Sequence, residues 1–519
     1  MIEIVEIKLP PGESNNSERI VEKCLKKSKQ KGKALTDWQI VRRSIDARGQ
    51  GVFFLLRVEL YFDEKIAPEP AVLGSLNPVH DKTPVIIVGA GPAGYFAALE
   101  LIELGLKPII FDRGKEVQSR RRDLKAIQQF GEVDRDSNYC FGEGGAGTYS
   151  DGKLYTRSHK RGNIYKAMKL FVEHGAKPDI LIDAHPHIGS NKLPVIVSNI
   201  RATIELYGGE VHFGSRVTDF IIHKNKISGV VINEKEEHFG EALILATGHS
   251  ARDIYHLLHD KNISIEAKPF ALGVRVEHPQ QLIDSIQYNQ NQREEELPAS
   301  SYSLACQVGD RGVFSFCMCP GGLVVPAATA PGEIVVNGMS LSRRDSAFAN
   351  SGTVVAVELS DLKDYQKYGV FAGLEFQKSV EQKMFAHGDG SQNAPSQRMT
   401  DFVKGVLSKD LPATSYIPGV HSAPVHQLLP GFISQKLQRG MITFGKKLKG
   451  FFTEEANVIG TESRTSSPIR IPRNKETYMH EDMQGLFPCG EGAGYAGGII
   501  SAAMDGQNVA KAVRRFLES

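Results

Sequence analysis

The sequence contains 519 residues, a length that indicates about three domains at about 150 residues per domain. Its 62 Lys and Arg residues nearly balance its 60 Asp and Glu residues, and 41% of its residues are hydrophobic, which excludes a disordered chain and a histone-like nucleic-acid binder. Glycine is in excess, with 51 residues against an average of about 7%. Because there is no Gly-X-Y period and no low-complexity tract, the excess also excludes collagen and flexible linkers.

The amino terminus predicts no export. It lacks the basic start and apolar core of a secretory signal, and no uninterrupted apolar run approaches the length of about 18 residues that a membrane-spanning helix needs. The six cysteines include no Cys-x-x-Cys pair. We therefore expect a cytoplasmic protein with reduced thiols and no membrane partner.

Residues 1–78 predict a separate small α+β module. An alternating stretch, a helical pattern from Ser17 and two later apolar runs give the order strand, helix, strand, strand, which is typical of a ferredoxin-like module. Lysines make its helix basic, but neighbouring acids nearly neutralise the module. A solvated helical face is therefore favoured over a nucleic-acid patch.

A nucleotide-binding fingerprint follows a proline-containing linker. The apolar run 83–88 predicts a buried parallel strand, and it leads through Gly89-Ala90-Gly91-Pro92-Ala93-Gly94 into a helical pattern. In such a turn the first glycine permits the tight turn, the second lets the backbone approach a pyrophosphate, and the third lets helix and strand pack closely. The next apolar strand ends in Asp112, whose carboxylate we expect to accept hydrogen bonds from both ribose hydroxyls of a dinucleotide.

Later segments resemble parts of the two-dinucleotide-domain flavoproteins. A strand runs into Ala246-Thr247-Gly248, and Gly490-Glu-Gly-Ala-Gly-Tyr-Ala-Gly-Gly498 leads into a helix near the carboxyl terminus. The resemblance implies that Glu491 holds the ribityl and phosphate region and that the following helix points its amino terminus at the flavin. FAD is therefore favoured over NAD as the ligand of the fingerprint.

A further glycine cluster lies at residues 141–153. Glycine backbone can lie close to a flat ring, and its N–H groups can hydrogen-bond the flavin edge; a simple glycine-rich loop is the alternative. The cofactor-binding residues that we expect are Gly89, Ala90, Gly91, Pro92, Ala93, Gly94, Asp112, Arg113, Gly145, Ala146, Gly147, Val217, Ala246, Thr247, Gly248, Gly490, Glu491, Gly498, Ile499 and Ile500.

Several motifs together resemble a group of bacterial FAD-dependent dehydrogenases often labelled NAD-utilising dehydrogenases. The resemblance covers nearly the whole chain, and it is carried by residues 42–48, 144–153, 317–322, 337–340, 462–470 and 490–498. It implies an α/β fold with a Rossmann-like FAD-binding domain at 79–264 and 446–519. An α+β substrate or cap domain is expected as an insertion at 265–445. The group's substrate is not established, so the resemblance implies no particular reaction.

Four side chains are candidates for assisting the flavin. Lys153 and Asp151 end the glycine-rich loop, where a lysine could approach the flavin N5 and a carboxylate could orient it; a loop-stabilising ion pair is the alternative. Arg464 and Arg470 flank a polar stretch. Their guanidinium groups could clamp a carboxylate or stabilise the reduced flavin, and surface ion-pair arginines are the alternative.

Metal and disulfide chemistry are not expected. His185 and His187 lack further ligands at suitable spacing, and Cys317-x-Cys319 has the same weakness, so its thiols are interpreted as small buried hydrophobes. A cysteine pair near Cys140 is missing, which disfavours a disulfide reductase. A second dinucleotide fingerprint is missing from residues 265–445, so NADH or NADPH would bind transiently over the flavin.

The leading hypothesis is an FAD-dependent oxidoreductase that moves hydride through flavin N5 to or from a small organic molecule. The alternatives are an RNA-associated or nucleotide-modifying flavoprotein that uses the basic module, and a flavin-binding protein without turnover. The nearly balanced charge disfavours nucleic acid as a partner.

Overall fold

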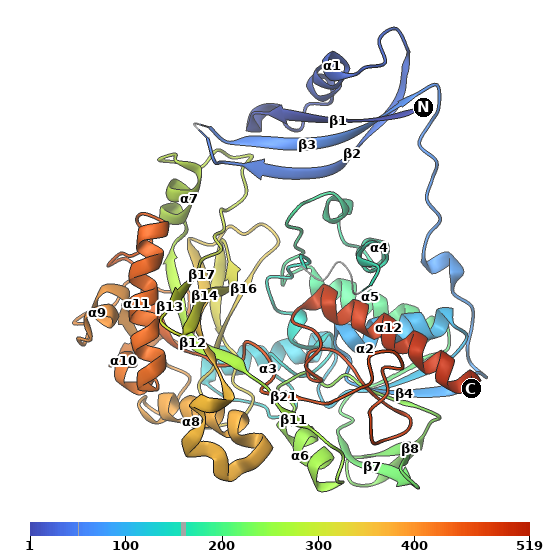
Figure 1. Cartoon of the computed structure of the whole chain (residues 1–519), viewed down its shortest axis with the longest axis vertical. Helices are drawn as coiled ribbons and strands as arrows, with labels where there is room; N and C mark the ends of the chain where they lie inside the picture. The colour runs from blue at the N-terminus through green and yellow to red at the C-terminus, as the bar shows by residue number, and fades with distance from the viewer. Residues whose placement is uncertain (50, 157–161) are drawn as a thin grey trace.

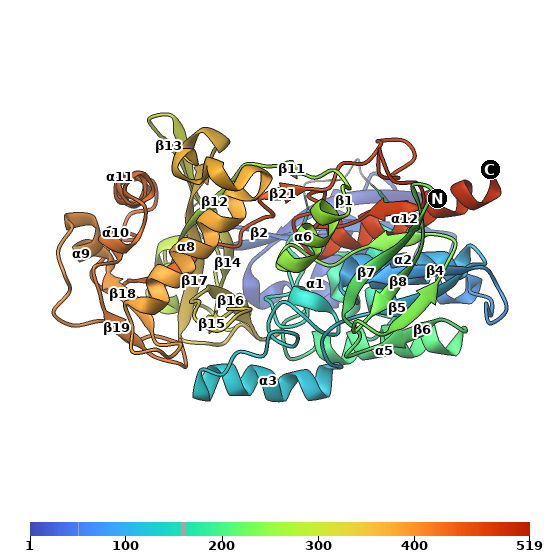
Figure 2. The same cartoon turned by 90° about the horizontal axis from the view of Figure 1, so that it is seen from below.

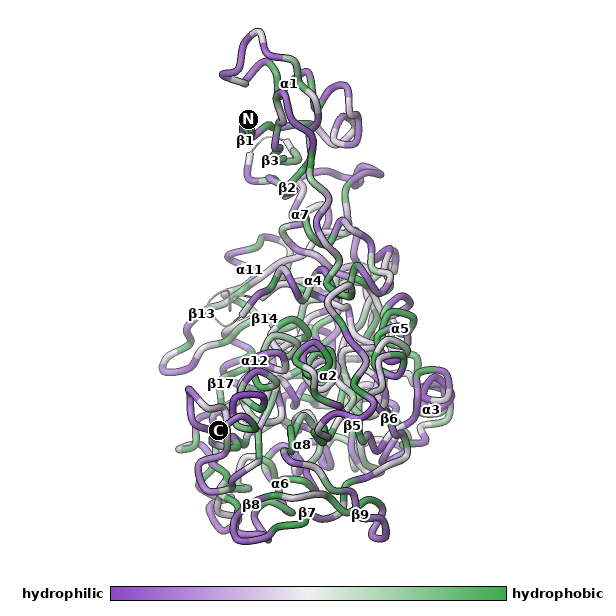
Figure 3. Tube along the Cα trace, turned by 90° about the vertical axis from the view of Figure 1, so that its right-hand side faces the viewer, coloured by the Kyte–Doolittle hydropathy of each residue, from purple (hydrophilic) through white to green (hydrophobic). Residues whose placement is uncertain are grey.

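The computed structural model describes residues 1–49, 51–156 and 162–519. The chain forms a nucleotide lobe, a sheet lobe and an N-terminal module, and the module projects from one end of the molecule (Figure 1, Figure 3). The two lobes lie side by side when the molecule is seen from below (Figure 2). Within the described residues no helix is both long and apolar enough to cross a bilayer.

The N-terminal module contains β1 (Ile2–Leu9), α1 (Ser17–Lys27), β2 (Leu35–Asp46) and β3 (Phe53–Phe62). Its antiparallel sheet has the order β1-β3-β2, and Asn16 caps α1 by accepting a hydrogen bond from the Arg19 N–H. This is the β-α-β-β half of a ferredoxin-like fold; the described residues of the module add no second helix and no fourth strand.

The module contacts both lobes. The backbone of Arg43 in β2 exchanges hydrogen bonds with Ile182 and Ala184 of the nucleotide lobe, and its guanidinium lies 2.7 Å from the Asp183 carboxylate. Tyr288 and Leu297 of the sheet lobe pack into the module's hydrophobic core.

The nucleotide lobe is built on a parallel sheet of order β22-β10-β4-β5-β6. This order places β4 next to both β5 and β10, the arrangement of a Rossmann-like fold whose ligands bind at the carboxyl ends of the strands. Its strands are β4 (Pro84–Val88), β5 (Lys107–Phe111), β6 (Glu210–His212), β10 (Leu243–Leu245) and β22 (Leu486–Pro488), with β7 (Val217–His223), β8 (Lys226–Ile232) and β9 (Glu236–Phe239) in a separate antiparallel sheet.

Helices cover this sheet. They are α2 (Pro92–Glu103), α3 (Val117–Phe130), α4 (Ile164–Glu173), α5 (Leu193–Leu206), α6 (Arg252–Asp260) and α12 (Ile499–Glu518). The last helix packs tightly against α2, because a Cβ at Gly506 would lie 2.1 Å from the Ala93 carbonyl oxygen. Helix α12 is thereby held beside the fingerprint helix, and the amino ends of α2 and α12 lie near each other.

The sheet lobe centres on a sheet of order β13-β14-β17-β12-β20-β18-β19. Its strands are β12 (Phe270–Pro279), β13 (Ala305–Val308), β14 (Arg311–Cys319), β17 (Phe348–Val357), β18 (Ala394–Arg398), β19 (Val420–Ser422) and β20 (Asn457–Glu462), and β15 (Gly322–Pro326) pairs with β16 (Val336–Ser340) beside them. The helices are α7 (Gln280–Tyr288), α8 (Ala372–Ala386), α9 (Met399–Lys404), α10 (Val425–Leu428) and α11 (Gly431–Lys447).

The expected boundary of this lobe at residue 445 is wrong. Strand β20, at residues 457–462, pairs with β12 and β18 of the sheet lobe. The chain returns to the nucleotide lobe only through β21 (Ile469–Arg470), which pairs with β11 (Glu266–Ala267). The sheet lobe therefore extends over residues 268–468, and β11 and β21 form the joint between the lobes.

Candidate active site and cofactor cradle

The fingerprint turn needs its glycines for different reasons. Gly89 has a φ of 107°, and a Cβ there would lie 2.5 Å from the Ala246 carbonyl oxygen; a Cβ at Gly94 would lie 2.0 Å from the Gly89 carbonyl oxygen. At Gly91 the nearest atom to such a Cβ is the Gly145 Cα, 3.9 Å away. Gly89 and Gly94 thus permit packing, whereas Gly91 borders open space that a pyrophosphate can approach.

Two helix amino termini converge beside this open space. Gly91 is the N-cap of α2 and Gly498 is the N-cap of α12, and neither helix has a side-chain capping hydrogen bond. A Cβ at Gly147 would lie 3.2 Å from Ile499 and 3.4 Å from Pro92, so the glycine-rich loop passes between the two ends. Uncapped N–H groups and the positive ends of the helix dipoles favour phosphate and the electron-rich edge of a flavin.

Asp112 joins the fingerprint turn to the glycine-rich loop. Its Oδ2 accepts a hydrogen bond from the Ala90 N–H at 2.9 Å, and its Oδ1 accepts from the N–H groups of Gly114 and Gly142. Because a carboxylate has about four acceptor positions, these bonds leave capacity for one ribose hydroxyl. The expectation that Asp112 accepts from both hydroxyls of a ribose stays a prediction.

Arg113 and Val217 lie around the same loop. The Arg113 guanidinium lies 4.7 Å from the centre of the Phe141 ring and pairs with Asp253. Val217, at the start of β7, is buried in the hydrophobic cluster that also contains Phe141. Both residues therefore support the loop in this structure.

The two later flavoprotein segments touch each other. A Cβ at Gly492 would lie 2.4 Å from the Gly248 carbonyl oxygen, and His249 Nδ1 lies 3.2 Å from Glu491 Oε1. Among the described residues, no atom outside the chain neighbours lies within 4 Å of a Cβ built at Gly248 or Gly498. Segments far apart in sequence thus form a continuous cradle, and the residues fit FAD.

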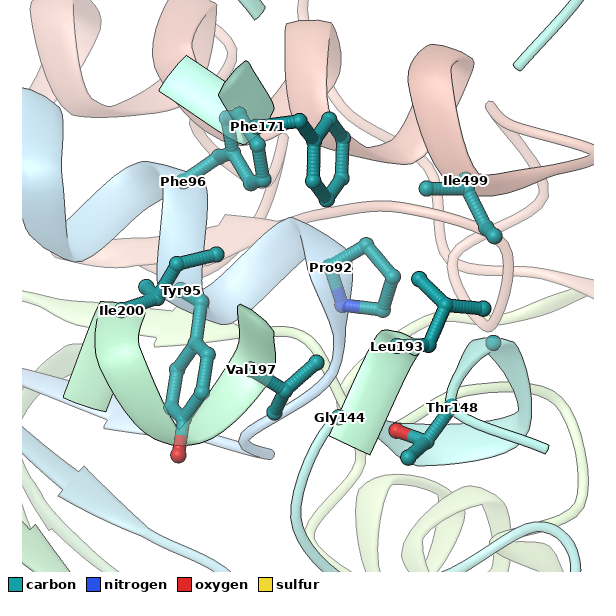
Figure 4. A pocket seen from close by; sticks show the side chains of 11 residues that line it. Pro92, Tyr95, Phe96, Gly144, Thr148, Phe171, Leu193, Val197, Ile200 and Ile499 are labelled. Atoms are coloured by element: carbon teal, nitrogen blue, oxygen red, sulfur yellow. The ribbon is translucent and has the colours of Figure 1, made fainter. Parts of the chain in front are cut away.

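A small apolar pocket lies beside Pro92 and Ile499, at the amino ends of α2 and α12 (Figure 4). It is lined by Pro92, Phe96, Thr148, Phe171 and Ile499, among others, and its volume is about 20 Å³. That volume holds about one water molecule, so the pocket is not a substrate site.

Asp151 is buried and paired with the sheet lobe. Its carboxylate accepts hydrogen bonds from the Ser340 hydroxyl and, at 3.1 Å, from Arg344 Nε. Burial acts to raise the pKa of Asp151, but the charges of Arg344 and Lys153, together with the hydrogen bonds from Arg344 and Ser340, outweigh it, so the pKa is lowered and the carboxylate stays ionised. Arg344, and not Lys153, is therefore the ion-pair partner of Asp151.

Lys153 also reaches across to the sheet lobe. Its Nζ donates a hydrogen bond to the Met318 carbonyl oxygen in β14, and its backbone bridges that of His187. Burial acts to lower the pKa of Lys153, but the neighbouring Cys317, Cys319 and Asp151 outweigh it, so the pKa is raised. We call Lys153, Cys317 and Cys319 the lysine–thiol cluster.

Arg464 is not available as a substrate clamp. Its Nε and Nη2 bind Glu381 at 3.0 and 2.9 Å, Nη2 also binds Glu333 at 3.0 Å, and Nη1 donates to the hydroxyls of Thr329 and Ser250. These contacts occupy the donors of the guanidinium group, so the expectation that Arg464 binds substrate or flavin is corrected.

Arg252 of α6 completes what we call the arginine–glutamate cluster: Arg252, Arg464, Glu333 and Glu381. Arg252 pairs with Glu333 at 2.7 Å and with Glu381 at 2.6 Å, and the Glu381 side chain is fully buried. The cluster joins the two lobes with balanced charge. Arg470, in contrast, is exposed in β21, with its guanidinium 5.9 Å from the Tyr495 ring centre.

Sequence reasoning missed Arg275 and the thiols beside it. Arg275 is fully buried in β12; its Nε lies 3.0 Å from the Glu462 carboxylate, and its Nη1 donates to the Cys317 carbonyl oxygen at 3.0 Å. Burial raises the pKa of Glu462 to about 7, against the opposing charge of Arg275. A single arginine in the otherwise apolar run 270–276 was the available signal.

Known proteins match the chain over the same segments. Residues 82–125 match a model described as "FAD binding domain", residues 269–465 match "FAD-dependent protein, C-terminal domain-like", and residues 1–61 match a domain of unknown function. The first two matches fall on the fingerprint segment and on the sheet lobe. They identify FAD as the cofactor for which the cradle is built.

Relatives are found at different distances. An uncharacterized protein of Clostridium beijerinckii is 43% identical over 430 residues, covering 82% of this chain and 80% of that protein. The FAD-dependent monooxygenase nodY2 of Hypoxylon pulicicidum is 25% identical over 233 residues, covering 41% of this chain and 45% of that one.

Solved structures resemble the chain only distantly. The flavin-dependent brominase Bmp2 is 14% identical with a TM-score of 0.37, covering 84% of this chain and 80% of that one. CtdE in complex with FAD is 10% identical with a TM-score of 0.32, covering 84% and 89%. The relationship to the clostridial protein is much closer. The chain therefore belongs to the same family as that clostridial protein, a family of FAD-dependent flavoproteins.

Proposed function

We propose that the protein is an FAD-dependent dehydrogenase or reductase that exchanges hydride with a small organic substrate bound where the two lobes meet. The observation that supports this proposal is the position of Lys153. It ends the glycine-rich loop that passes the cofactor cradle, and its Nζ reaches the β14 backbone of the sheet lobe. A charged side chain is thereby held between the cofactor-binding segment and the lobe that would cover it.

The chain's own groups have distinct roles in this proposal. The amino ends of α2 and α12 bind the pyrophosphate and the flavin edge, and Gly91 keeps side chains out of the approach. Lys153, which keeps its positive charge, stabilises negative charge that develops on the flavin or on the substrate. Bound FAD supplies the hydride exchange at N5.

The electron donor is part of the proposal. The sequence has no second dinucleotide fingerprint between residues 265 and 445, so NADH or NADPH binds transiently against the flavin. A second candidate reaction is monooxygenation, because a relative that is 25% identical over 233 residues is named as an FAD-dependent monooxygenase. The two candidates differ in whether substrate turnover consumes oxygen.

The first experiment measures bound FAD by its yellow absorbance in purified wild-type protein and in Gly91→Val. We expect the variant to fold and lose FAD, because its side chain would occupy the pyrophosphate approach without clashing with protein. Gly431→Val in α11, where a Cβ also meets nothing within 4 Å, is the matched control and keeps its FAD. Full FAD in Gly91→Val would contradict the assigned cradle.

The second experiment mixes the holoenzyme anaerobically with NADH or with NADPH and follows bleaching of the flavin absorbance. Bleaching by one of them identifies the donor and supports the dehydrogenase proposal. Oxygen consumption that rises stoichiometrically with substrate conversion would instead support monooxygenation. A flavin that neither donor nor chemical reductant can bleach would contradict both.

A further inference from the structure

Cys317 and Cys319 lie at an irregularity in β14. The pairing of β14 with β17 shifts register between Phe316 and Cys319, and Cys317 has a φ of 44°, a left-handed conformation that non-glycine residues rarely adopt. Such a bulge redirects side chains and is typical of the surroundings of active sites. Cys319 Sγ donates a hydrogen bond to the Cys317 carbonyl oxygen at 3.4 Å, and the two thiols lie close enough to shift each other's pKa.

Two cationic side chains donate hydrogen bonds to backbone carbonyl groups of this bulge. Arg275 donates to the Cys317 carbonyl oxygen, and Lys153 donates to the Met318 carbonyl oxygen. Cys319 is fully buried, whereas Cys317 and Lys153 keep part of their surface accessible. Lys153, the residue that ends the glycine-rich loop, therefore lies beside the segment that carries the two thiols.

The charged side chains around the bulge favour a negative charge on the thiols. Asp151 is paired with Arg344, and Glu462 lies beside Arg275. Within the described ranges no carboxylate forms an ion pair with Lys153, although its ammonium is held in a buried site. Lys153, Arg275 and Arg344 thus bring three positive charges to this region, against the two carboxylates of Asp151, which also acts on Lys153, and Glu462. A thiolate can supply the missing negative charge, because an ammonium that has left water needs enough counter-charge nearby.

The ionisation of the thiols agrees with this assignment. The hydrogen bond from Cys319 lowers the pKa of Cys317; burial opposes this shift, and Lys153 and Arg275 add to it. The same hydrogen bond, together with burial, raises the pKa of Cys319. The pKa shifts of the two thiols run in opposite directions, which favours a pair that shares one proton, the state of a reactive dithiol.

We propose that Cys317 and Cys319 are a redox-active dithiol that exchanges two electrons with the bound FAD. The proposal deepens the function proposed above and rests on it. When the pair is oxidised, one S–S bond forms between the two sulfurs, and two electrons and one proton leave. Bound FAD would supply the acceptor for the two electrons and the proton; the reverse step cleaves the S–S bond and restores a thiolate and a thiol.

An electron count tests the dithiol. Holoenzyme is oxidised with ferricyanide, freed of oxidant, and titrated anaerobically with dithionite. Wild-type protein is expected to take up about four electrons per FAD, because a disulfide and a flavin each accept two. Cys317→Ser and Cys319→Ser are expected to take up about two. Cys306→Ser is the matched control, since Cys306 lies in β13 of the same sheet without a cysteine partner among the described residues, and it is expected to keep four.

Peptide mass spectrometry of the same wild-type samples needs no variant. The oxidised protein is expected to yield the Cys317–Cys319 disulfide, and the reduced protein is expected to be alkylated at Cys317. An uptake of two electrons in wild type, with both thiols free after oxidation, would overturn the dithiol while leaving the flavin function intact. A protein without FAD would overturn the proposed function, yet the disulfide mapping would still decide the thiol chemistry.

Discussion

The lysine–thiol cluster and the arginine–glutamate cluster both join the two lobes through buried charged groups, but they differ in how their charges are matched. In the arginine–glutamate cluster two guanidinium groups face two carboxylates, with distances of 2.6–3.0 Å between paired atoms. In the lysine–thiol cluster the ammonium of Lys153 faces a backbone carbonyl and two thiols.

This difference separates a structural role from a chemical one. Groups that satisfy one another completely have no free donor or acceptor for a ligand, so they stabilise the contact between the lobes. A cation that lacks a carboxylate partner lowers the pKa of a nearby thiol and makes it reactive. Motif membership ranked Arg464 with Lys153, and only their partners distinguish them.

The largest expected effect is a loss of stability when the arginine–glutamate cluster is disrupted. Arg464→Met removes one of two cations from Glu333 and Glu381, and we expect the free energy of unfolding to fall by about 3–5 kcal/mol, because a buried carboxylate loses its counter-charge. Urea unfolding of the holoenzyme measures this change. Arg470→Met, at an exposed position, is the control and should change stability by less than about 0.5 kcal/mol. Equal effects of the two variants would contradict the structural assignment.

Lys153→Met is expected to change reactivity more than stability. The lost cation is compensated when the thiol pair takes up a proton, so we expect a stability loss of less than about 1.5 kcal/mol. Because the pKa of Cys317 is lowered, its alkylation rate in wild-type protein should be nearly constant between about pH 6 and pH 8. In the variant one of the groups that lower this pKa is removed, so the pKa of Cys317 should rise and the alkylation rate should increase with pH within this range.

Rates of Cys317 alkylation by iodoacetamide, resolved by peptide mass spectrometry, provide this test. Lys436→Met, which removes a lysine that pairs with Asp310 elsewhere on the sheet lobe, is the control and should keep the flat profile. A steep pH dependence already in the wild-type protein would show that the thiols carry no charge at neutral pH.

The smallest effect on stability is expected for a substitution in the N-terminal module. Arg43 pairs with Asp179 and Asp183 at a partly exposed position, where an ion pair contributes about 1 kcal/mol or less. Arg43→Ala should therefore leave FAD content unchanged and increase hydrogen exchange of the backbone at residues 182–184. A loss of FAD would show that the module shapes the active site.

The nucleotide lobe was largely predictable because its signals are local. The apolar run before Gly89, the glycine spacing and the strand ending in Asp112 lie within about 25 residues, and strand, turn and helix occur there as expected. The β-α-β-β order of the module followed from periodicity in the same way. These patterns depend on neighbours in sequence, which the sequence displays directly.

The arginine–glutamate cluster and the lysine–thiol cluster could not be predicted, because their residues are far apart in the sequence. Arg464 meets Glu333, Glu381 and Arg252 only after the sheet lobe folds, and Lys153 meets β14 across 165 residues of chain. The Cys-x-Cys segment was interpreted as apolar packing because its counter-charge is invisible in its own surroundings. The boundary near residue 445 failed similarly, since β20 pairs with β12, a strand that begins 187 residues earlier in the chain.

The reduction potential of bound FAD tests the central claim, that the lysine–thiol cluster adjoins the flavin, most directly. It is measured by dye-coupled anaerobic titration of wild-type, Lys153→Met and Lys436→Met holoenzymes. A cation near the ring stabilises the anionic reduced flavin, so we predict a more negative potential in Lys153→Met and an unchanged potential in Lys436→Met. An unchanged potential in Lys153→Met, with full FAD content, would contradict the account.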